Sequence, residues 1–266
     1  RSCARTDTTT GIISLAPAAS MMNLSIETIA SVALVVTFAY TVVGLTGFGA
    51  SIVSMPILVQ LLPLRLALPM MLIYDLAGGI LIGVRNRRAI ERAELLRLVP
   101  FMLIGIALGV TVLVKAPERA LLLLLGMFVL TFAAWSLLFR PGNTPLARAW
   151  AIPLGTFGGI FSALFGTGGP IYTVYLARRL QDKSTLRATV SLLLFLSALA
   201  RLASFLAAGL FAPPDLLVLI PTLLPCALLG MYIGTRLHYR LPSHRVVQVV
   251  WVILIIGGAT LVLRNL

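Results

Sequence analysis

Charged residues are scarce in this chain of 266 residues. Asp, Glu, Lys and Arg together make up 11% of it, whereas hydrophobic residues make up 59%. A soluble domain is about one quarter charged and about half apolar. A soluble fold of this size could not remove so much apolar surface from water. The composition therefore excludes an ordinary soluble domain and predicts an all-α integral membrane protein whose partner is the lipid bilayer.

Cysteine, histidine and acidic residues are also few. Cys3 and Cys226 lie far apart, and Cys226 falls in an apolar run, which argues against a disulfide framework. The two histidines, His238 and His244, lie in a basic segment, so no metal site and no cofactor is expected. The chain has only 8 acidic residues but 21 basic ones. In a membrane protein such a surplus marks cytoplasmic loops, so we expect no nucleic-acid partner.

The apolar runs differ in length. Six of them are long enough to cross a bilayer: 66–84, 98–114, 120–139, 186–211, 216–235 and 246–263. Two further regions, 28–62 and 150–177, are interrupted by glycines at 47–49 and at 166–170. The last arm, 170–177, covers only about 12 Å as a helix and cannot span. We therefore predict two re-entrant helical hairpins beside the crossings, surrounded by protein or a water-filled cavity.

The second half of the chain repeats features of the first half. Pro100, Gly105, Gly109 and Pro117 recur 125 residues later as Pro225, Gly230, Gly234 and Pro242. The glycine breaks recur at an offset of 119 residues. We therefore predict a flexible tail (1–25), a first repeat (26–140), a cytoplasmic linker (141–149) and a second repeat (150–266). The paired glycines are interpreted as helix-packing positions.

The positions of the basic residues favour the re-entrant arrangement. If both hairpins crossed fully, ten Lys and Arg residues would fall on each side of the membrane. With re-entrant hairpins, 14 fall on one side, in 85–97, 140–149, 178–187 and 236–245, and six on the other. This bias places those loops in the cytoplasm of a bacterium and both termini in the periplasm. Each repeat then has three crossings, so the two repeats are inverted in the inner membrane.

The second arm of each hairpin begins at a glycine break, where a helix N-terminus exposes unpaired N–H groups and the positive end of its dipole. Such ends favour anions. We predict a small anionic substrate bound at this place. The candidate binding residues are Thr46, Gly47, Gly49, Ser51, Gly166, Thr167, Gly168, Gly169 and Tyr172. A second interpretation is that the glycines only permit tight turns and that each hydroxyl bonds its own helix.

Two charged residues fall deep within apolar runs. Asp75 lies near the centre of 66–84, and Arg201 lies within 186–211. Charges at membrane depth are costly and often functional. Arg201 is a candidate to bind the anion, and Asp75, the only acid well inside, is a candidate proton carrier. The other interpretation is a purely structural Asp75–Arg201 pair that neutralises both.

Several of these features together resemble the sulfite exporter TauE/SafE family, also called TSUP. The cues are the segment 47–56 (GFGASIVSMP), the segment 166–170 (GTGGP), the basic loop 85–92 and the glycines at 105 and 109. The resemblance implies outward transport of small sulfur-containing anions such as sulfite, sulfoacetate or related organosulfonates.

These features favour a secondary transporter that works by alternating access, with or without proton coupling. The alternative is an anion channel or an uptake carrier for another small anion. The sequence is compatible with a homodimer in both cases. An intramembrane enzyme would need a nucleophile with a base, or a metal cluster, inside the membrane. Neither histidine lies there and the acids do not cluster, so no catalytic residues are expected.

Overall fold

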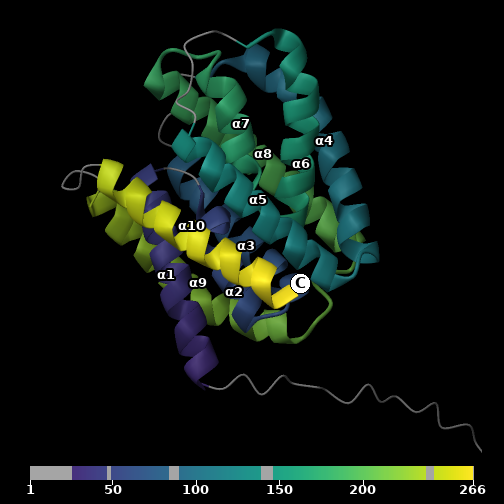
Figure 1. Cartoon of the computed structure of the whole chain (residues 1–266), viewed down its shortest axis with the longest axis vertical. Coiled ribbons are helices and arrows are strands. Elements are labelled where there is room, and N and C mark those ends of the chain that lie inside the picture. The colour runs from purple at the N-terminus through teal and green to yellow at the C-terminus, as the bar shows by residue number, and fades with distance from the viewer. Residues whose placement is uncertain (1–25, 47–48, 84–89, 139–145, 238–242, 266) are drawn as a thin grey trace, which may run out of the picture.

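The computed structural model describes residues 26–46, 49–83, 90–138, 146–237 and 243–265. All regular structure in these ranges is helical, which confirms the all-α class (Figure 1). The helices are α1 (Ile26–Thr46), α2 (Ala50–Leu61), α3 (Leu64–Gly83), α4 (Arg92–Lys115), α5 (Glu118–Leu138), α6 (Ala151–Phe165), α7 (Gly168–Ala177), α8 (Lys183–Ala207), α9 (Asp215–Leu237) and α10 (Ser243–Asn265), with a 3-10 turn, η2 (Arg148–Trp150), before α6. The predicted tail, 1–25, lies outside the described residues.

Five helices in the described part of the chain are long and apolar enough to cross a membrane, by length and composition: α1, α4, α5, α8 and α9. Four of them coincide with predicted crossings. α1 was expected only as one arm of a hairpin, yet its apolar stretch of 20 residues is long enough to cross by itself. α2 and α7 are much shorter, with 12 and 10 residues. The chain is therefore a multi-pass membrane protein.

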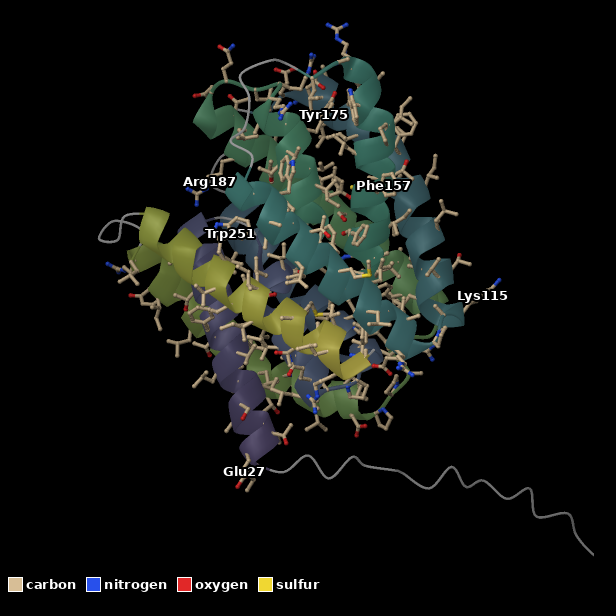
Figure 2. All side chains as sticks on the ribbon, viewed as in Figure 1. Glu27, Lys115, Phe157, Tyr175, Arg187 and Trp251 are labelled. Atoms are coloured by element: carbon tan, nitrogen blue, oxygen red, sulfur yellow. The ribbon has the colours of Figure 1, made fainter. Side chains whose placement is uncertain are left out.

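The outer surface of the bundle is apolar. Large side chains such as Leu34, Leu103, Phe157 and Ile256 are exposed on it. Phe157 projects from the outer side of α6 in Figure 2. A helix that is hydrophobic on its outer face as well as its inner face is suited to lipid rather than to water. The exposed surface thus agrees with the membrane assignment.

The long helices pack most closely between the two halves of the chain. α4 lies against α6, and α9 lies against α1. A Cβ atom on Gly105 would overlap the carbonyl oxygen of Thr156, and one on Gly230 would overlap that of Thr37. The glycines therefore do lie at close helix crossings. The two crossings also correspond in sequence, because Gly105 and Gly230 differ by 125 residues and Thr37 and Thr156 by 119.

The two helix breaks fall at the predicted glycine motifs. Gly49, which precedes α2, has a φ of 99°, and Gly166, which ends α6, has a φ of 72°. These left-handed conformations are readily adopted only by glycine. Between the two breaks, α3 and α8 pack against each other. The fold thus brings both breaks to the middle helices that carry Asp75 and Arg201.

The start of α8 is fixed by a polar cap. The carboxylate of Asp182 accepts hydrogen bonds from the backbone N–H of Thr185 at 2.8 Å and from the hydroxyls of Ser184 and Thr185 at 2.6 and 2.7 Å. These donors hold the pKa of the Asp182 carboxyl well below its usual range. The cap defines where the helix bearing Arg201 begins.

Candidate functional site

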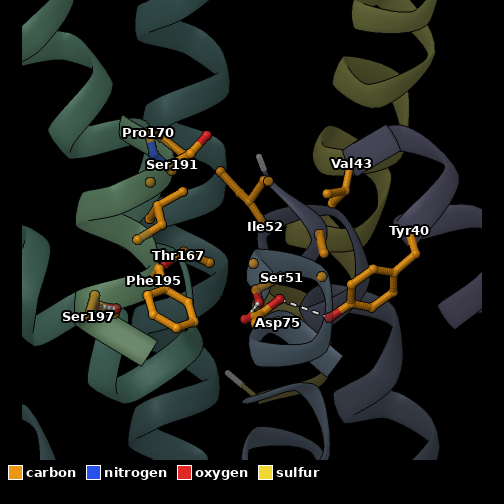
Figure 3. A pocket seen from close by; sticks show the side chains of 18 of the residues that line it. Tyr40, Val43, Ser51, Ile52, Asp75, Thr167, Pro170, Ser191, Phe195 and Ser197 are labelled. Carbon is orange, nitrogen blue, oxygen red and sulfur yellow. Dashed lines mark hydrogen bonds between the residues drawn. The ribbon is translucent and has the colours of Figure 1, made fainter. Parts of the chain in front are cut away.

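A cavity of about 80 Å³ lies where the two helix breaks meet α3 and α8 (Figure 3). By the same measure one water needs about 10–15 Å³, so the space suits a small anion with its water. In Figure 3, Tyr40, Ser51 and Asp75 approach it from one side, and Thr167, Phe195 and Ser197 from the other. The full lining comprises Tyr40, Val43, Gly49, Ala50, Ser51, Ile52, Asp75, Gly78, Gly79, Ser162, Gly166, Thr167, Gly169, Pro170, Ser191, Leu194, Phe195, Ser197, Arg201 and Met231.

Asp75 and Arg201 form an ion pair in the cavity wall. Nη2 of Arg201 lies 3.1 Å from Oδ2 of Asp75, and Nη1 donates to the carbonyl oxygen of Ser162 at 2.9 Å. The Arg201 side chain is only 4% exposed, whereas that of Asp75 is 24% exposed. Nε of Arg201 is buried and has no hydrogen-bond partner among the described residues. An unused N–H on a buried guanidinium is costly unless a ligand or water accepts it.

The carboxylate of Asp75 also bonds to the two helices on either side of the first break, α1 and α2. The Tyr40 hydroxyl donates to Oδ1 at 2.8 Å, and the Ser51 hydroxyl donates to Oδ2 at 3.3 Å. Asp75 therefore links α1, α2, α3 and, through Arg201, α8. Any change in its charge or position acts on four helices at once.

The two helix breaks are in direct contact beside Arg201. A Cβ atom on Gly166 would lie 2.6 Å from Oγ of Ser51 and 3.0 Å from Nη1 of Arg201. The residues preceding α2 and α7, Gly49 and Thr167, make no side-chain cap hydrogen bond. The first turns of both helices thus keep their positive ends near the guanidinium, which makes this place attractive to an anion.

Comparison with known proteins shows the family of the chain. The family model described as "Sulfite exporter TauE/SafE" matches residues 32–261. The chain belongs to the TauE/SafE family. It is also 28% identical over 196 residues to the probable inner membrane transporter protein TsaS of Comamonas testosteroni, an alignment that covers 72% of this chain and 81% of that protein. No solved structure matches. The resemblance seen in the sequence is confirmed, and the chain is a membrane transporter rather than an enzyme.

Six of the ten predicted binding residues of this TauE/SafE protein come together at the cavity. Its lining includes Gly49, Ser51, Gly166, Thr167, Gly169 and Arg201, and also Asp75, the candidate proton carrier. Gly168 and Tyr172 do not line it. The Tyr172 ring is fully buried and packs against Gly158 and Gly168, where a Cβ atom would overlap it. The Thr46 side chain and Gly47 lie outside the described residues.

Other lining residues had not been singled out in the sequence. Ser162 and Ser197 are joined by a hydrogen bond in the cavity wall, with hydroxyl oxygens 2.7 Å apart, and both are buried. Ser197 lies four residues before Arg201 and therefore on the same face of α8. That spacing, counted from Arg201, is the signal that could have identified Ser197, whereas Ser191, ten residues before Arg201, is not marked by it. Tyr40 carries no such signal, because it is an aromatic residue within a long apolar run.

The chemistry available at the cavity is recognition rather than bond breaking. Among the described residues no group of three His, Cys, Asp or Glu side chains lies close enough to hold a metal ion. The polar groups are instead a guanidinium, a carboxylate, hydroxyls and helix N-termini. These groups can bind an oxyanion and exchange it for an internal carboxylate.

Proposed function

We propose that this protein exports a small sulfur-containing anion, such as sulfite, sulfoacetate or a related organosulfonate, by alternating access. The observation that carries the proposal is the buried Arg201, whose Nε has no hydrogen-bond partner among the described residues, beside the N-termini of two broken helices. Oxyanion oxygens accept charge-assisted hydrogen bonds from a guanidinium and from helix amides. The serine and threonine hydroxyls around the cavity supply further donors.

The proposal includes two inverted repeats, 26–140 and 150–266, joined by a cytoplasmic linker at 141–149. Each has a re-entrant hairpin, α1–α2 or α6–α7. α2 and α7 would rise only about 18 and 15 Å, well short of a hydrocarbon core of about 30 Å. The equivalent glycine crossings of α4 on α6 and α9 on α1 support the repeat, and the uneven basic residues support the inversion.

This topology predicts the labelling of two introduced cysteines. Leu61→Cys, at the end of α2, and Leu180→Cys, after α7, should react with a membrane-impermeant maleimide from opposite sides of the inner membrane. The test uses intact cells and inverted vesicles of a variant without Cys3 and Cys226. Reaction of both cysteines from the same side would exclude inverted hairpins.

The position of the cavity relative to the ion pair agrees with export. On α3 the lining continues from Asp75 to Gly79, toward the end of the helix at Gly83. On α8 it runs from Arg201 back to Ser191, toward the start at Lys183. Both helix ends adjoin the basic loops. With those loops in the cytoplasm, the cavity faces inward, where it would receive its substrate. Exit of an anion from an inside-negative cell gains about 2.3 kcal/mol per charge per 100 mV.

A substrate panel in proteoliposomes tests the function. Sulfite, sulfoacetate, thiosulfate and sulfate are compared under an imposed membrane potential. We expect saturable flux and counterflow with sulfite or sulfoacetate. Flux that does not saturate and shows no counterflow would indicate the channel, and net flux only toward the cytoplasmic face would indicate the uptake carrier. No flux of any of the four anions would contradict the proposal.

If Asp75 carries the coupled proton, its replacement should impair only the transport that is driven by a pH gradient. A protonated Asp75 no longer attracts Arg201, so the proton would free the guanidinium for the anion. The Asp75→Asn variant mimics this neutral form permanently. We expect it to retain flux driven by membrane potential and to lose the increase produced by a pH gradient. Unchanged pH-driven flux in Asp75→Asn would exclude Asp75 as the proton carrier.

A further inference from the structure

A second polar cluster lies at the opposite end of α7 from the cavity. Its centre is the carboxylate of Glu94, a residue that is 5% exposed near the start of α4. Oε1 lies 2.7 Å from Nη2 of Arg179 and 2.7 Å from Nη1 of Arg97, and Oε2 accepts from the hydroxyl of Tyr175 at 2.8 Å. Arg179 also donates to the carbonyl oxygen of Leu146. One buried carboxylate therefore ties α4 to the end of α7.

The corresponding helix in the first half is held differently. α2 packs against α10 and α5 as well as its hairpin partner, and α10 crosses it in Figure 1. Pro56 of α2 would meet a Cβ atom on Gly257 of α10 at 2.9 Å. Tyr175 occupies the place of Pro56 at the repeat offset of 119 residues. α7 packs mainly against α6 and α8. In the second half, the hydrogen bonds and ion pairs of Glu94 hold α7, in place of the apolar packing that holds α2.

The same short helix forms part of the cavity wall at its other end. Thr167, Gly169 and Pro170 line the cavity, and Tyr175 lies near the upper end of the bundle in Figure 2. A helix of ten residues rises about 15 Å. Because one short helix joins the cluster to the cavity, we expect a shift at Tyr175 to displace the N-terminus of α7 relative to Arg201.

We infer that Glu94 is a positioning residue for the anion site: through Tyr175 and Arg179 it fixes the N-terminus of α7 at the cavity. The transport test of this inference rests on the proposed function, because it measures the KM of sulfite. The chain provides a matched control in Arg97, which bonds the same oxygen but belongs to α4 itself. Removing Arg97 weakens the cluster without cutting the tie between α4 and α7.

The first test is transport of sulfite by Arg179→Gln, Tyr175→Phe and Arg97→Gln in proteoliposomes. We expect Arg179→Gln to raise KM about tenfold, as loss of a charge-assisted hydrogen bond allows, with Vmax per folded protein unchanged. Tyr175→Phe should raise KM by a smaller factor, and Arg97→Gln should leave it within twofold. A purely structural cluster would lower the amount of folded protein in all three variants without changing KM. Equal KM values in Arg179→Gln and Arg97→Gln would overturn the inference.

A second test needs no substrate. Ser191→Cys places a reporter in the cavity wall of α8, in a protein without Cys3 and Cys226, and its reaction with a maleimide is followed in detergent solution. We expect at least a threefold change in the rate with Arg179→Gln and none with Arg97→Gln. Equal rates would refute the inference. If the rates differ while the wild-type protein moves none of the four anions, the proposed function fails and the role of Glu94 in positioning α7 stands.

Discussion

Arg201→Gln should lower the apparent affinity for the transported anion by about 100-fold. The substitution removes the only cation among the described residues of the cavity wall and leaves the carboxylate of Asp75 without its ion-pair partner at 3.1 Å. Loss of a hydrogen bond to a charged group costs about 1.5–3 kcal/mol, which corresponds to roughly tenfold to 100-fold in binding. The measurement is the KM of sulfite counterflow in proteoliposomes at fixed pH.

The same substitution also lowers stability, so a second variant is needed to separate the two effects. Breaking a buried ion pair by removing one partner costs about 3–5 kcal/mol, whereas removing both partners is often close to neutral. We therefore expect Asp75→Asn combined with Arg201→Gln to recover the melting temperature of the wild-type protein but not its affinity. Wild-type KM in this double variant would show that the pair is structural only.

The two deep charges show what the sequence can and cannot predict about a membrane site. Their depth follows from counting along apolar runs, and their pairing follows from the cost of leaving either one alone. The free Nε of Arg201 does not follow, because it depends on how the other two nitrogens are used by Asp75 and by the carbonyl of Ser162. That carbonyl belongs to the last turn of α6, which the sequence alone does not place against α8.

The two helix breaks illustrate the same limit. Glycine motifs predict where a helix breaks, since Gly49 and Gly166 adopt conformations that other residues avoid. They do not predict which side chains face the break. Tyr172 is separated from the cavity because Gly158 and Gly168 leave room for its ring behind the lining. Tyr40 contacts Asp75 from a different helix. The two residues lie 35 positions apart in the sequence, so no local sequence pattern predicts the contact.

Alanine substitutions at the helix crossings should lower the stability of the protein strongly. In an isolated helix, Gly→Ala stabilises by about 1 kcal/mol. At Gly105 and Gly230 the new Cβ would overlap a backbone carbonyl oxygen, of Thr156 and Thr37 respectively, which cannot rotate away as a side chain can. The two helices must then separate along their whole contact, and overpacking of this kind costs about 3 kcal/mol. We expect both variants to melt roughly 5 °C or more below the wild-type protein in detergent.

A third glycine provides the control for this comparison. At Gly169, in the first turn of α7, a Cβ atom would meet only the flexible end of Leu194 at 3.5 Å. Gly169→Ala should therefore leave the melting temperature unchanged or raise it slightly, whatever its effect on transport. If the two crossings are equivalent, Gly105→Ala and Gly230→Ala must destabilise to a similar degree, because each places a Cβ atom against a backbone carbonyl oxygen of the helix that it crosses. A large fall in melting temperature for only one of the two variants would mean that the halves share a sequence pattern but that its glycines do not support helix packing equally.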